Sequence, residues 1–221
     1  MENIVSLLPT QTTQRVIKKR TILIYQGEVP RQAYIVKSGA FKAYHLNKMG
    51  EEQITGFRTG GDLFPETWLF GKTSSALYYY EALEDSIVYS VEKSSLLELV
   101  NSNTDLQRQL LDYFVNNYTS LLMQINALEQ SRAAEKLLLM LYYLRFRYGK
   151  EVKPGEFHLS ISLTHTTLAG LLGLTRETTT IELGRLKRKN VINYNGREFI
   201  IYQNTLESKL ALEGFDDIQL K

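Results

Sequence analysis

The feature that most constrains this sequence is a pair of short amphipathic segments, residues 163–173 and 175–190, separated by one turn. The first is small and apolar and ends at Gly173, a residue type that commonly terminates helices in the left-handed conformation. The second begins at Thr175, whose hydroxyl can accept a hydrogen bond from the free N–H groups of a first helical turn. Two short helices joined by a turn containing Gly form a helix-turn-helix, whose second helix lies in the DNA major groove.

The second segment, TRETTTIELGRLKRKN, combines an apolar stripe with a polar and basic face. We expect Ile181, Leu183 and Leu186 to point inward. The first turns hold six consecutive side chains that can donate or accept hydrogen bonds, which a helix that only packs would not need. The last turns hold cations, which suit the negative end of the helix dipole. The pattern favours a recognition helix over its alternative, an ordinary solvated helix start.

These segments resemble the helix-turn-helix of the Crp/Fnr superfamily of bacterial transcription regulators. The matching residues are Leu163-Thr164, Leu168-Ala169, Leu172-Gly173-Leu174, residues 175–178 (TRET) and residues 183–186 (LGRL), followed by a hairpin around Asn195-Gly196 that corresponds to the family's wing. The resemblance implies that Arg176 and Glu177 read base edges. The chemistry agrees, because Arg can bind guanine O6 and N7 together and Glu can accept from cytosine N4.

One position departs from the family pattern. Many members carry a second base-reading Arg where this sequence has Ile181, so we expect an altered half-site preference, with a thymine methyl contact from Ile181 and a contribution from Thr180. His165, at the start of the first helix, is interpreted either as a phosphate contact or as a solvated histidine. The predicted DNA-binding residues are Thr164, His165, Thr175, Arg176, Glu177, Thr178, Thr180 and Arg185.

The distribution of charge supports a polyanionic partner for the C-terminal part alone. The net charge is +2, but residues 1–130 carry 12 Lys and Arg against 14 Asp and Glu, whereas residues 131–221 carry 14 against 10. Residues 176–197 hold six basic and two acidic side chains. Because a run of charge is usually a solvated face, this asymmetry is supporting evidence only.

Several classes of protein are excluded. The sequence has no cysteine, which rules out disulfides, thiolate zinc sites and Cys-held iron–sulfur clusters, including the oxygen-sensing cluster of part of the Crp/Fnr family. The three histidines lack the spacing of a zinc helix, and no catalytic motif is present, so we expect no metal, no cofactor and no enzymatic activity. There is no signal peptide and no membrane-length apolar run, which predicts a cytoplasmic protein without a membrane partner.

The region from about residue 22 to 91 has the texture of a β domain. After a short helix and lead-in over residues 1–20, it shows runs at 21–25, 32–36, 40–46, 52–58, 76–83 and 87–91, separated by turn residues. Many short strands with regular turns predict a small sandwich or barrel. Their order resembles the β-roll sensor domain of the Crp/Fnr family. We therefore predict an α+β fold with a β-roll over 1–103, a long dimerisation helix over 104–130 and a winged helix-turn-helix over 131–221.

The nucleotide-binding pattern of that sensor domain does not carry over. In residues 61–82, which we call the cassette, Pro65 replaces the family's Gly, although Glu66 remains, and the position of the phosphate-binding Arg falls near Ala76. A buried phosphate without a paired cation is costly, so we predict no functional cAMP or cGMP binding. The cassette is instead aromatic, which indicates either rings that fill the vacated pocket or a site for a flat or acyl ligand. The candidate ligand-binding residues are Phe64, Glu66, Trp68, Tyr78 and Tyr80.

The long helix shows two neighbouring apolar stripes, and a helix that is wet on one side needs only one. Residues 110, 114, 117, 121 and 128 form one stripe, and residues 111, 115, 118, 122 and 125 form the other. Two stripes predict burial against the β-roll and against the same helix of a second subunit. We assign dimerisation to Leu110, Phe114, Asn117, Leu121 and Leu128. The alternative is a helix buried entirely within one chain.

Two functions remain open from the sequence. The first is a homodimeric transcription regulator that reads an inverted repeat, with double-stranded DNA, a second copy of itself and RNA polymerase as partners and an unknown small-molecule effector as a further one. The second is a ligand-sensing or protein-interaction module that keeps a vestigial DNA-binding motif. A steep salt dependence of DNA affinity without sequence preference would favour the second.

Overall fold

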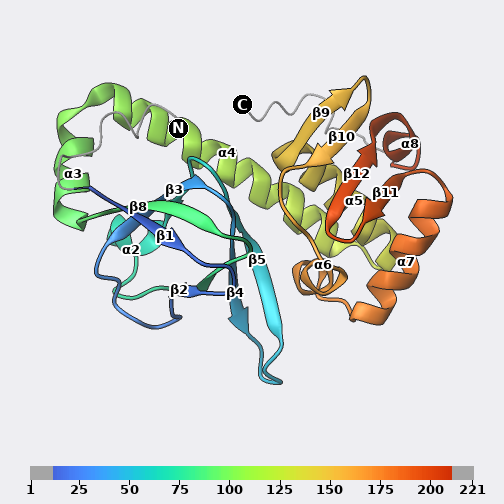
Figure 1. Cartoon of the computed structure of the whole chain (residues 1–221), viewed down its shortest axis with the longest axis horizontal. Coiled ribbons are helices and arrows are strands. Elements are labelled where there is room, and N and C mark those ends of the chain that lie inside the picture. The colour runs from blue at the N-terminus through green and yellow to red at the C-terminus, as the bar shows by residue number, and fades with distance from the viewer. Residues whose placement is uncertain (1–11, 211–221) are drawn as a thin grey trace. The chain divides into compact units, whose positions relative to one another are not determined.

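The computed structural model describes residues 12–210 and divides the chain into two compact units, which meet in sequence between Tyr113 and Phe114. Figure 1 labels most elements of both units, and each unit is described by itself. Among residues 12–210, none of the helices combines the length and the apolar character that a bilayer span requires.

The first unit contains two antiparallel four-stranded sheets. One has the order β1-β8-β3-β6, formed by Thr13–Ile17, Ser86–Val91, Ala33–Ser38 and Leu63–Phe64. The other has the order β2-β7-β4-β5, formed by Ile22–Ile24, Tyr79–Ala82, Phe41–Leu46 and Glu52–Arg58. The core lies between the sheets, because its buried side chains come from both, among them Val36, Phe41, Phe64, Tyr80 and Val88. The predicted α+β class and the β-rich N-terminal domain are confirmed.

One element of this unit differs from the prediction. Residues 13–17, which the sequence assigned to a short helix and lead-in, form the strand β1, and β1 pairs with β8 from Thr13↔Ser90 to Ile17↔Ser86. In this edge strand, Thr13 to Val16 are exposed and only Ile17 is buried, so the segment lacks the alternation by which a strand is recognised. The rest of the predicted N-terminal helix lies outside the described residues.

Helices close the first unit. The short α2 (Glu66–Leu69) follows β6, α3 (Lys93–Ser102) follows β8, and α4 (Thr104–Glu129) begins next. Leu106, Leu110 and Tyr113 on the first turns of α4 are buried. The Tyr113 hydroxyl accepts from the Leu63 backbone N–H at 3.3 Å and lies 3.4 Å from the Leu63 carbonyl, so it fixes this part of α4 to β6.

The two predicted stripes of α4 have different environments. Seven large apolar side chains on α4 are 41–63% exposed: Leu111, Val115, Tyr118, Leu121, Leu122, Ile125 and Leu128. This surface contains the whole second stripe together with Leu121 and Leu128 from the first. Leu110, assigned to dimerisation, is only 5% exposed and therefore belongs to the core of its own chain. Phe114 is half-buried, and Asn117 accepts a hydrogen bond from Arg147 at 3.2 Å, so neither lies on the open surface.

The second unit follows with α5 (Ala133–Tyr148), whose Leu137, Met140, Leu141 and Leu144 are fully buried. The remaining elements are β9 (Gly149–Lys153), β10 (Glu156–Leu159), α6 (His165–Leu172), α7 (Arg176–Arg188), β11 (Ile192–Asn195), β12 (Glu198–Tyr202) and α8 (Gln203–Glu207). The four strands form one antiparallel sheet in the order β11-β12-β10-β9. The β11–β12 hairpin turns at Gly196, which has φ +59°. The helix α8 is the last element described, and residues 211–221 lie outside the described part of the chain.

Candidate DNA-binding surface

The turn between α6 and α7 is fixed by local hydrogen bonds that the sequence prescribes. Thr164 caps α6 by accepting from the Thr167 backbone N–H at 3.0 Å. Gly173 ends α6 in the left-handed conformation, with φ 62° and ψ 34°, as its lack of a Cβ allows. Thr175 then caps α7 by accepting from the Thr178 N–H at 3.1 Å. The second helix therefore starts at a defined point and in a defined direction.

The inner face of α7 differs in one residue from the predicted stripe. Leu183 and Leu186 are buried as expected, but Ile181 is 55% exposed and Thr179 is fully buried in its place. Residues 179, 183 and 186 follow the i, i+4, i+7 spacing of one helical face, which residue 181 does not. Thr179 tolerates burial because its hydroxyl donates to the Thr175 carbonyl at 2.9 Å. Ile181 is consequently an apolar side chain on the open face, where a thymine methyl contact was predicted.

The first turns of α7 expose fewer free polar groups than the sequence indicates. Thr175 donates its hydroxyl to Thr178 at 2.9 Å, so both of these side chains serve the cap. Arg176 and Glu177 are exposed at the tip, and Thr180 is exposed one turn further along. The surface available to a partner is thus defined by one cation, one carboxylate and one hydroxyl.

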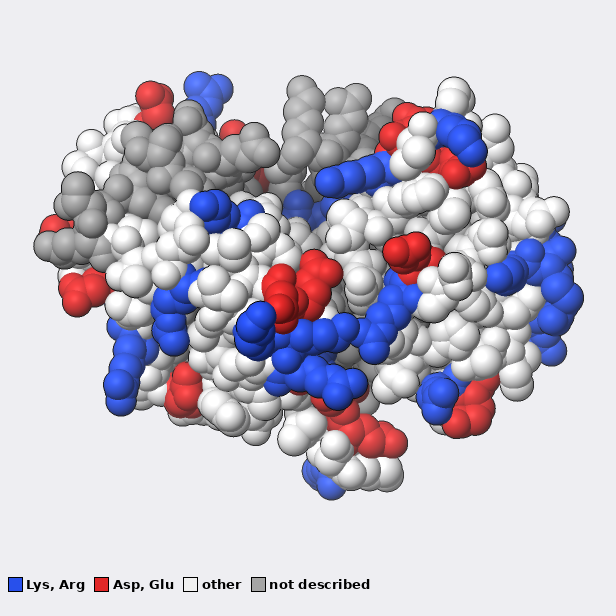
Figure 2. Space-filling model, viewed as in Figure 1, with Lys and Arg blue, Asp and Glu red and all other residues white. Residues whose placement is uncertain are grey.

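The basic end of α7 is partly engaged within the unit. Arg185 forms an ion pair with Glu182 at 2.5 Å, and Lys187 donates to the Tyr194 carbonyl at 2.9 Å while its ammonium lies 4.5 Å from the Tyr194 ring centroid. Arg188 and Lys189 are exposed. Lys and Arg side chains gather over α7 at the right-hand edge of Figure 2, with few acidic side chains among them. This surface suits an anion such as the DNA backbone.

His165 lies where the first helix meets the second helix and the hairpin. Its Nδ1 is 3.0 Å from the Thr180 hydroxyl, and its ring meets the ring of Tyr194 edge-to-face with 5.2 Å between centroids. Burial, followed by the charge of Arg176, lowers the pKa of His165. The structure therefore brings His165 and Thr180 together, whereas the sequence treated them as separate candidates.

The cassette has a different character from this open surface. Glu66 forms an ion pair with Arg58 at 3.0 Å, and their side chains are only 14% and 21% exposed. Burial lowers the pKa of Arg58, but the charge of Glu66, with Tyr80, Tyr113 and Asp62, outweighs this effect and raises it. The cation beside Glu66 is Arg58, the last residue of β5, whereas the family pattern places the phosphate-binding Arg near position 76. No sequence signal links the two, because β5 and α2 meet only in the fold.

Aromatic side chains occupy the rest of the cassette. Phe64 is fully buried and stacks on Tyr80 with 4.8 Å between ring centroids. Trp68 is 7% exposed and lies under the Lys93 ammonium, and Tyr78 packs against the core while its ring meets His45. The five candidate ligand-binding residues thus make internal contacts, which favours the interpretation that rings fill the vacated pocket.

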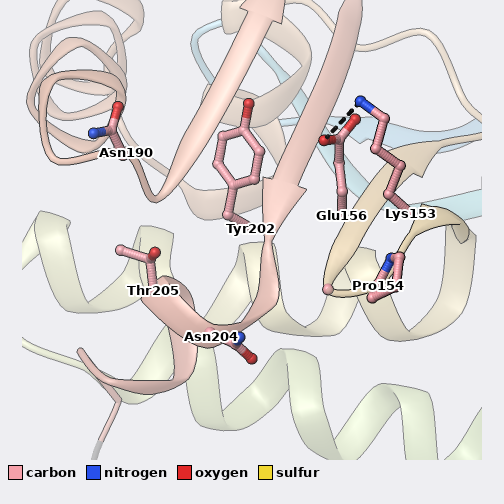
Figure 3. A pocket seen from close by; sticks show the side chains of 8 residues that line it. Lys153, Pro154, Glu156, Asn190, Tyr202, Asn204 and Thr205 are labelled. Carbon is pink, nitrogen blue, oxygen red and sulfur yellow. Dashed lines mark ion pairs between the residues drawn. The ribbon is translucent and has the colours of Figure 1, made fainter.

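A separate groove of about 500 Å³ lies in the second unit (Figure 3). It is lined by Lys153, Pro154, Gly155, Glu156, Asn190, Tyr202, Asn204 and Thr205, and it includes the ion pair between Lys153 and Glu156 at 3.7 Å. None of the residues predicted to bind DNA or a ligand lines it. Within residues 12–210, no three His, Asp or Glu side chains are grouped so that they could hold a metal ion.

Comparison with known proteins agrees with both units. Residues 14–103 match the cyclic nucleotide-binding domain family, and residues 131–205 match the Crp-like helix-turn-helix domain family. The fumarate and nitrate reduction regulatory protein of Yersinia pestis is 29% identical over 198 residues, covering 88% of this chain and 77% of the relative. The anaerobic regulatory protein of Pasteurella multocida is 28% identical over 206 residues, covering 93% and 73%.

Solved structures share the same fold. FixK2 from Bradyrhizobium japonicum superposes with a TM-score of 0.74 at 23% identity, covering 92% of this chain and 99% of that one. A CooA variant from Carboxydothermus hydrogenoformans gives 0.73 at 20% identity, covering 94% and 89%. Both of the relatives compared above are named as regulatory proteins. With a cyclic nucleotide-binding fold in its first part and a capped helix-turn-helix in its second, the chain belongs to the Crp/Fnr family of DNA-binding transcription regulators.

Proposed function

We propose that the protein acts as a homodimer that reads an inverted DNA repeat through α7 and is not controlled by cAMP. The observation that carries this proposal is the tip of α7, where Arg176, Glu177 and Thr180 are exposed beyond a first turn whose other polar groups are already bonded. Arg binds guanine and Glu accepts from cytosine, so the tip has the chemistry of direct base reading. Thr164, Thr175 and Thr178 then serve mainly to position the helices.

The exposed surface of α4 supports pairing with a second copy. Residues 111, 115, 118, 122 and 125 follow each other at alternating spacings of four and three, which is the a/d pattern of a coiled coil. An apolar stripe of this length on a soluble helix favours a partner with the same pattern. We place the dimer seam on these residues with Leu121 and Leu128 beside it. Leu110, Phe114 and Asn117 of the predicted set lie outside this seam.

The seam can be tested with matched substitutions. Leu122→Glu places a charge in the middle of the proposed seam, whereas Leu46→Glu changes a leucine of the same exposure, 45%, on β4. Native mass spectrometry should show the wild type and Leu46→Glu as dimers and Leu122→Glu as a monomer. A dimeric Leu122→Glu protein would contradict the seam.

Independence from cAMP is supported by the internal pairing of the cassette. The Glu66 carboxylate, which in the family would meet a ribose hydroxyl, is bonded to Arg58. A nucleotide that used Glu66 would have to break this ion pair and displace packed rings. We further propose RNA polymerase as a partner, an effector other than cAMP if one is needed, and a cytoplasmic location, where chromosomal DNA is accessible.

The central experiment is selection of binding sites from a random duplex library by the purified protein. The expected product is an inverted repeat whose half-sites lie about one helical turn, roughly 34 Å, apart. Two protein chains should bind each selected duplex in native mass spectrometry. If binding is strongly salt-dependent but no sequence is enriched, the protein is instead a module with a vestigial DNA-binding motif.

A further inference from the structure

Three elements meet around the side chain of His165. It lies at the first position of α6, its Nδ1 is 3.0 Å from the hydroxyl of Thr180 on α7, and its ring packs edge-to-face on Tyr194 of β11. Tyr194 is itself held by stacking on the buried Phe199 at 5.2 Å and by Lys187 above its ring at 4.5 Å. The imidazole is therefore supported from behind while one ring nitrogen faces α7.

The neighbouring threonines of α7 show why this contact matters. Thr179 is buried and donates its hydroxyl to the Thr175 carbonyl within its own helix. Thr180 is exposed on the same open face as Ile181, and its hydroxyl is bonded to a side chain of the other helix. A threonine hydroxyl rotates freely and can act as donor or acceptor, so a base in the groove meets whichever direction its neighbour imposes.

The surroundings of His165 favour the uncharged form of its ring. Burial, followed by the charge of Arg176, lowers the pKa of His165 below its usual value of 6.5, which favours the neutral ring at pH 7. A neutral imidazole has one N–H and one lone pair, unlike the doubly donating cation. The Nδ1 contact therefore holds the Thr180 hydroxyl in one direction, with the tautomer of the ring setting which of the two atoms donates.

We propose that His165 is a positioning residue for base reading: from the first helix, it orients the Thr180 hydroxyl and so contributes to the sequence preference of the second. The inference rests on the proposed function, because it assumes that α7 lies in the major groove. The competing role for His165 is a phosphate contact. Removing a phosphate contact weakens binding about equally on all sequences. Removing a positioning residue acts through Thr180 and changes the preference at one base pair.

The test is a double-mutant cycle on the full-length protein with a selected operator and a scrambled duplex. His165→Phe keeps a ring against Tyr194 but removes Nδ1, and Thr180→Val keeps the shape of Thr180 but removes its hydroxyl. Each single variant should lose about ten-fold in operator affinity, the size of one net hydrogen bond, and the double variant should lose no more than either single one. Affinity for the scrambled duplex should stay unchanged.

Controls separate positioning from folding. His158→Phe changes a histidine of β10 that contacts Glu156 at 3.0 Å and should leave operator affinity unchanged. His165→Asn keeps a polar group near the place of Nδ1 and should restore most of the affinity and the wild-type preference. Thermal unfolding of each variant shows whether the fold is intact. If His165→Phe alone fails to fold, the comparison of His165→Asn with Thr180→Val decides the question.

The outcomes are distinct. The proposal is supported if site selection with His165→Phe and Thr180→Val relaxes the preference at the same base pair. Additive losses in the double variant, or equal losses on the operator and the scrambled duplex, would overturn the positioning role while leaving the proposed function in place. A wild-type protein that enriches no sequence would instead overturn the proposed function and, with it, this inference.

Discussion

Each unit holds an arginine and a glutamate close together, but in a different arrangement. In the first unit, Arg58 of β5 lies beside Glu66 of the cassette, and in the second, Arg176 and Glu177 lie at the tip of α7. In the cassette region, Arg58 and Glu66 are 3.0 Å apart and largely buried, so each neutralises the other. At the tip of α7, Arg176 and Glu177 are adjacent in the helix and exposed. Residues at i and i+1 do not face each other on a helix, which leaves both charges directed outward.

The difference shows that pairing, rather than composition, distinguishes a closed site from an open one. A buried ion pair has already exchanged its water for a partner, and a ligand must break that pair before it binds. Exposed groups on a capped helix keep their hydrogen-bonding capacity and need little reordering when a partner arrives. We therefore expect the same two residue types to support stability in one unit and recognition in the other.

The largest effect should come from removing the open pair. Arg176→Ala and Glu177→Ala should each weaken operator binding by about 1–3 kcal/mol at the base pair concerned, since each loses a direct base contact. Gel-shift titration with matched and mismatched operators measures this loss, and circular dichroism checks the fold. Arg132→Ala, which removes an exposed arginine paired with Glu135 near the start of α5, is the control. Retention of the full sequence preference by both tip variants would make the two regions equivalent and break the comparison.

The closed pair should respond through stability. Glu66→Gln leaves the Arg58 charge without its partner, and we expect the free energy of unfolding to fall by about 1–3 kcal/mol, allowing for the partial exposure of the pair. Denaturant titration measures this change. The double variant Arg58→Met with Glu66→Gln should lose less than the single one, because no unpaired charge remains. Asp85→Asn, which removes the exposed partner of Lys18, should have little effect. A single variant as stable as the wild type would contradict the role assigned to the pair.

A smaller effect should appear with pH in the second unit. Burial and Arg176 lower the pKa of His165 in the folded state, so the unfolded state binds more protons in the range just below the usual value of 6.5. The free energy of unfolding should therefore fall slightly as the pH drops through this range and be regained above it. Denaturation of wild type and His165→Phe between pH 5 and 8 isolates the contribution. An identical pH dependence in the two proteins would show that His165 does not contribute to the pH dependence of stability.

The smallest expected effect sharpens the comparison by its absence. Cyclic AMP should leave the thermal midpoint unchanged, because Glu66 is already paired with Arg58 and Phe64 is stacked on Tyr80. A ligand present at a hundred times its Kd would raise the free energy of unfolding by about 2.7 kcal/mol, which a thermal scan detects readily. Glu66→Gln in the same assay checks that the scan reports on this unit. Stabilisation by cAMP would show that the cassette opens.

Local signals explain how much could be predicted from the sequence. Thr164, Gly173 and Thr175 act within a few residues of themselves, so the boundaries of α6 and α7 follow from cap chemistry alone. The burial of Thr179 could not be predicted in this way. The buried stripe was predicted from apolar residues, and Thr179 is a polar residue whose hydroxyl is hydrogen-bonded within its own helix. For the same reason Ile181 was wrongly placed in the buried stripe.

Contacts between distant segments explain what was missed. The partner of Glu66 lies on a strand that meets α2 only after folding, and β1 is an edge strand whose exposed residues hide its periodicity. The link between His165 and Thr180 spans two helices, each of which was predicted correctly. The sequence therefore indicated the candidate residues of the proposed DNA-binding surface but not the contacts between them.

The hydrogen bonds between the Tyr113 hydroxyl and the Leu63 backbone couple α4 to strand β6. Leu63 directly precedes Phe64 of the cassette, and its backbone N–H is tied to a phenol that projects from α4. A molecule that repacks the aromatic rings and shifts this strand must either move the Tyr113 side chain with it or break the Tyr113–Leu63 hydrogen bond. The helix α4, which carries Tyr113, continues into the apolar surface that we propose as the subunit seam. A displacement of the aromatic rings could therefore be transmitted to that seam through Leu63 and Tyr113.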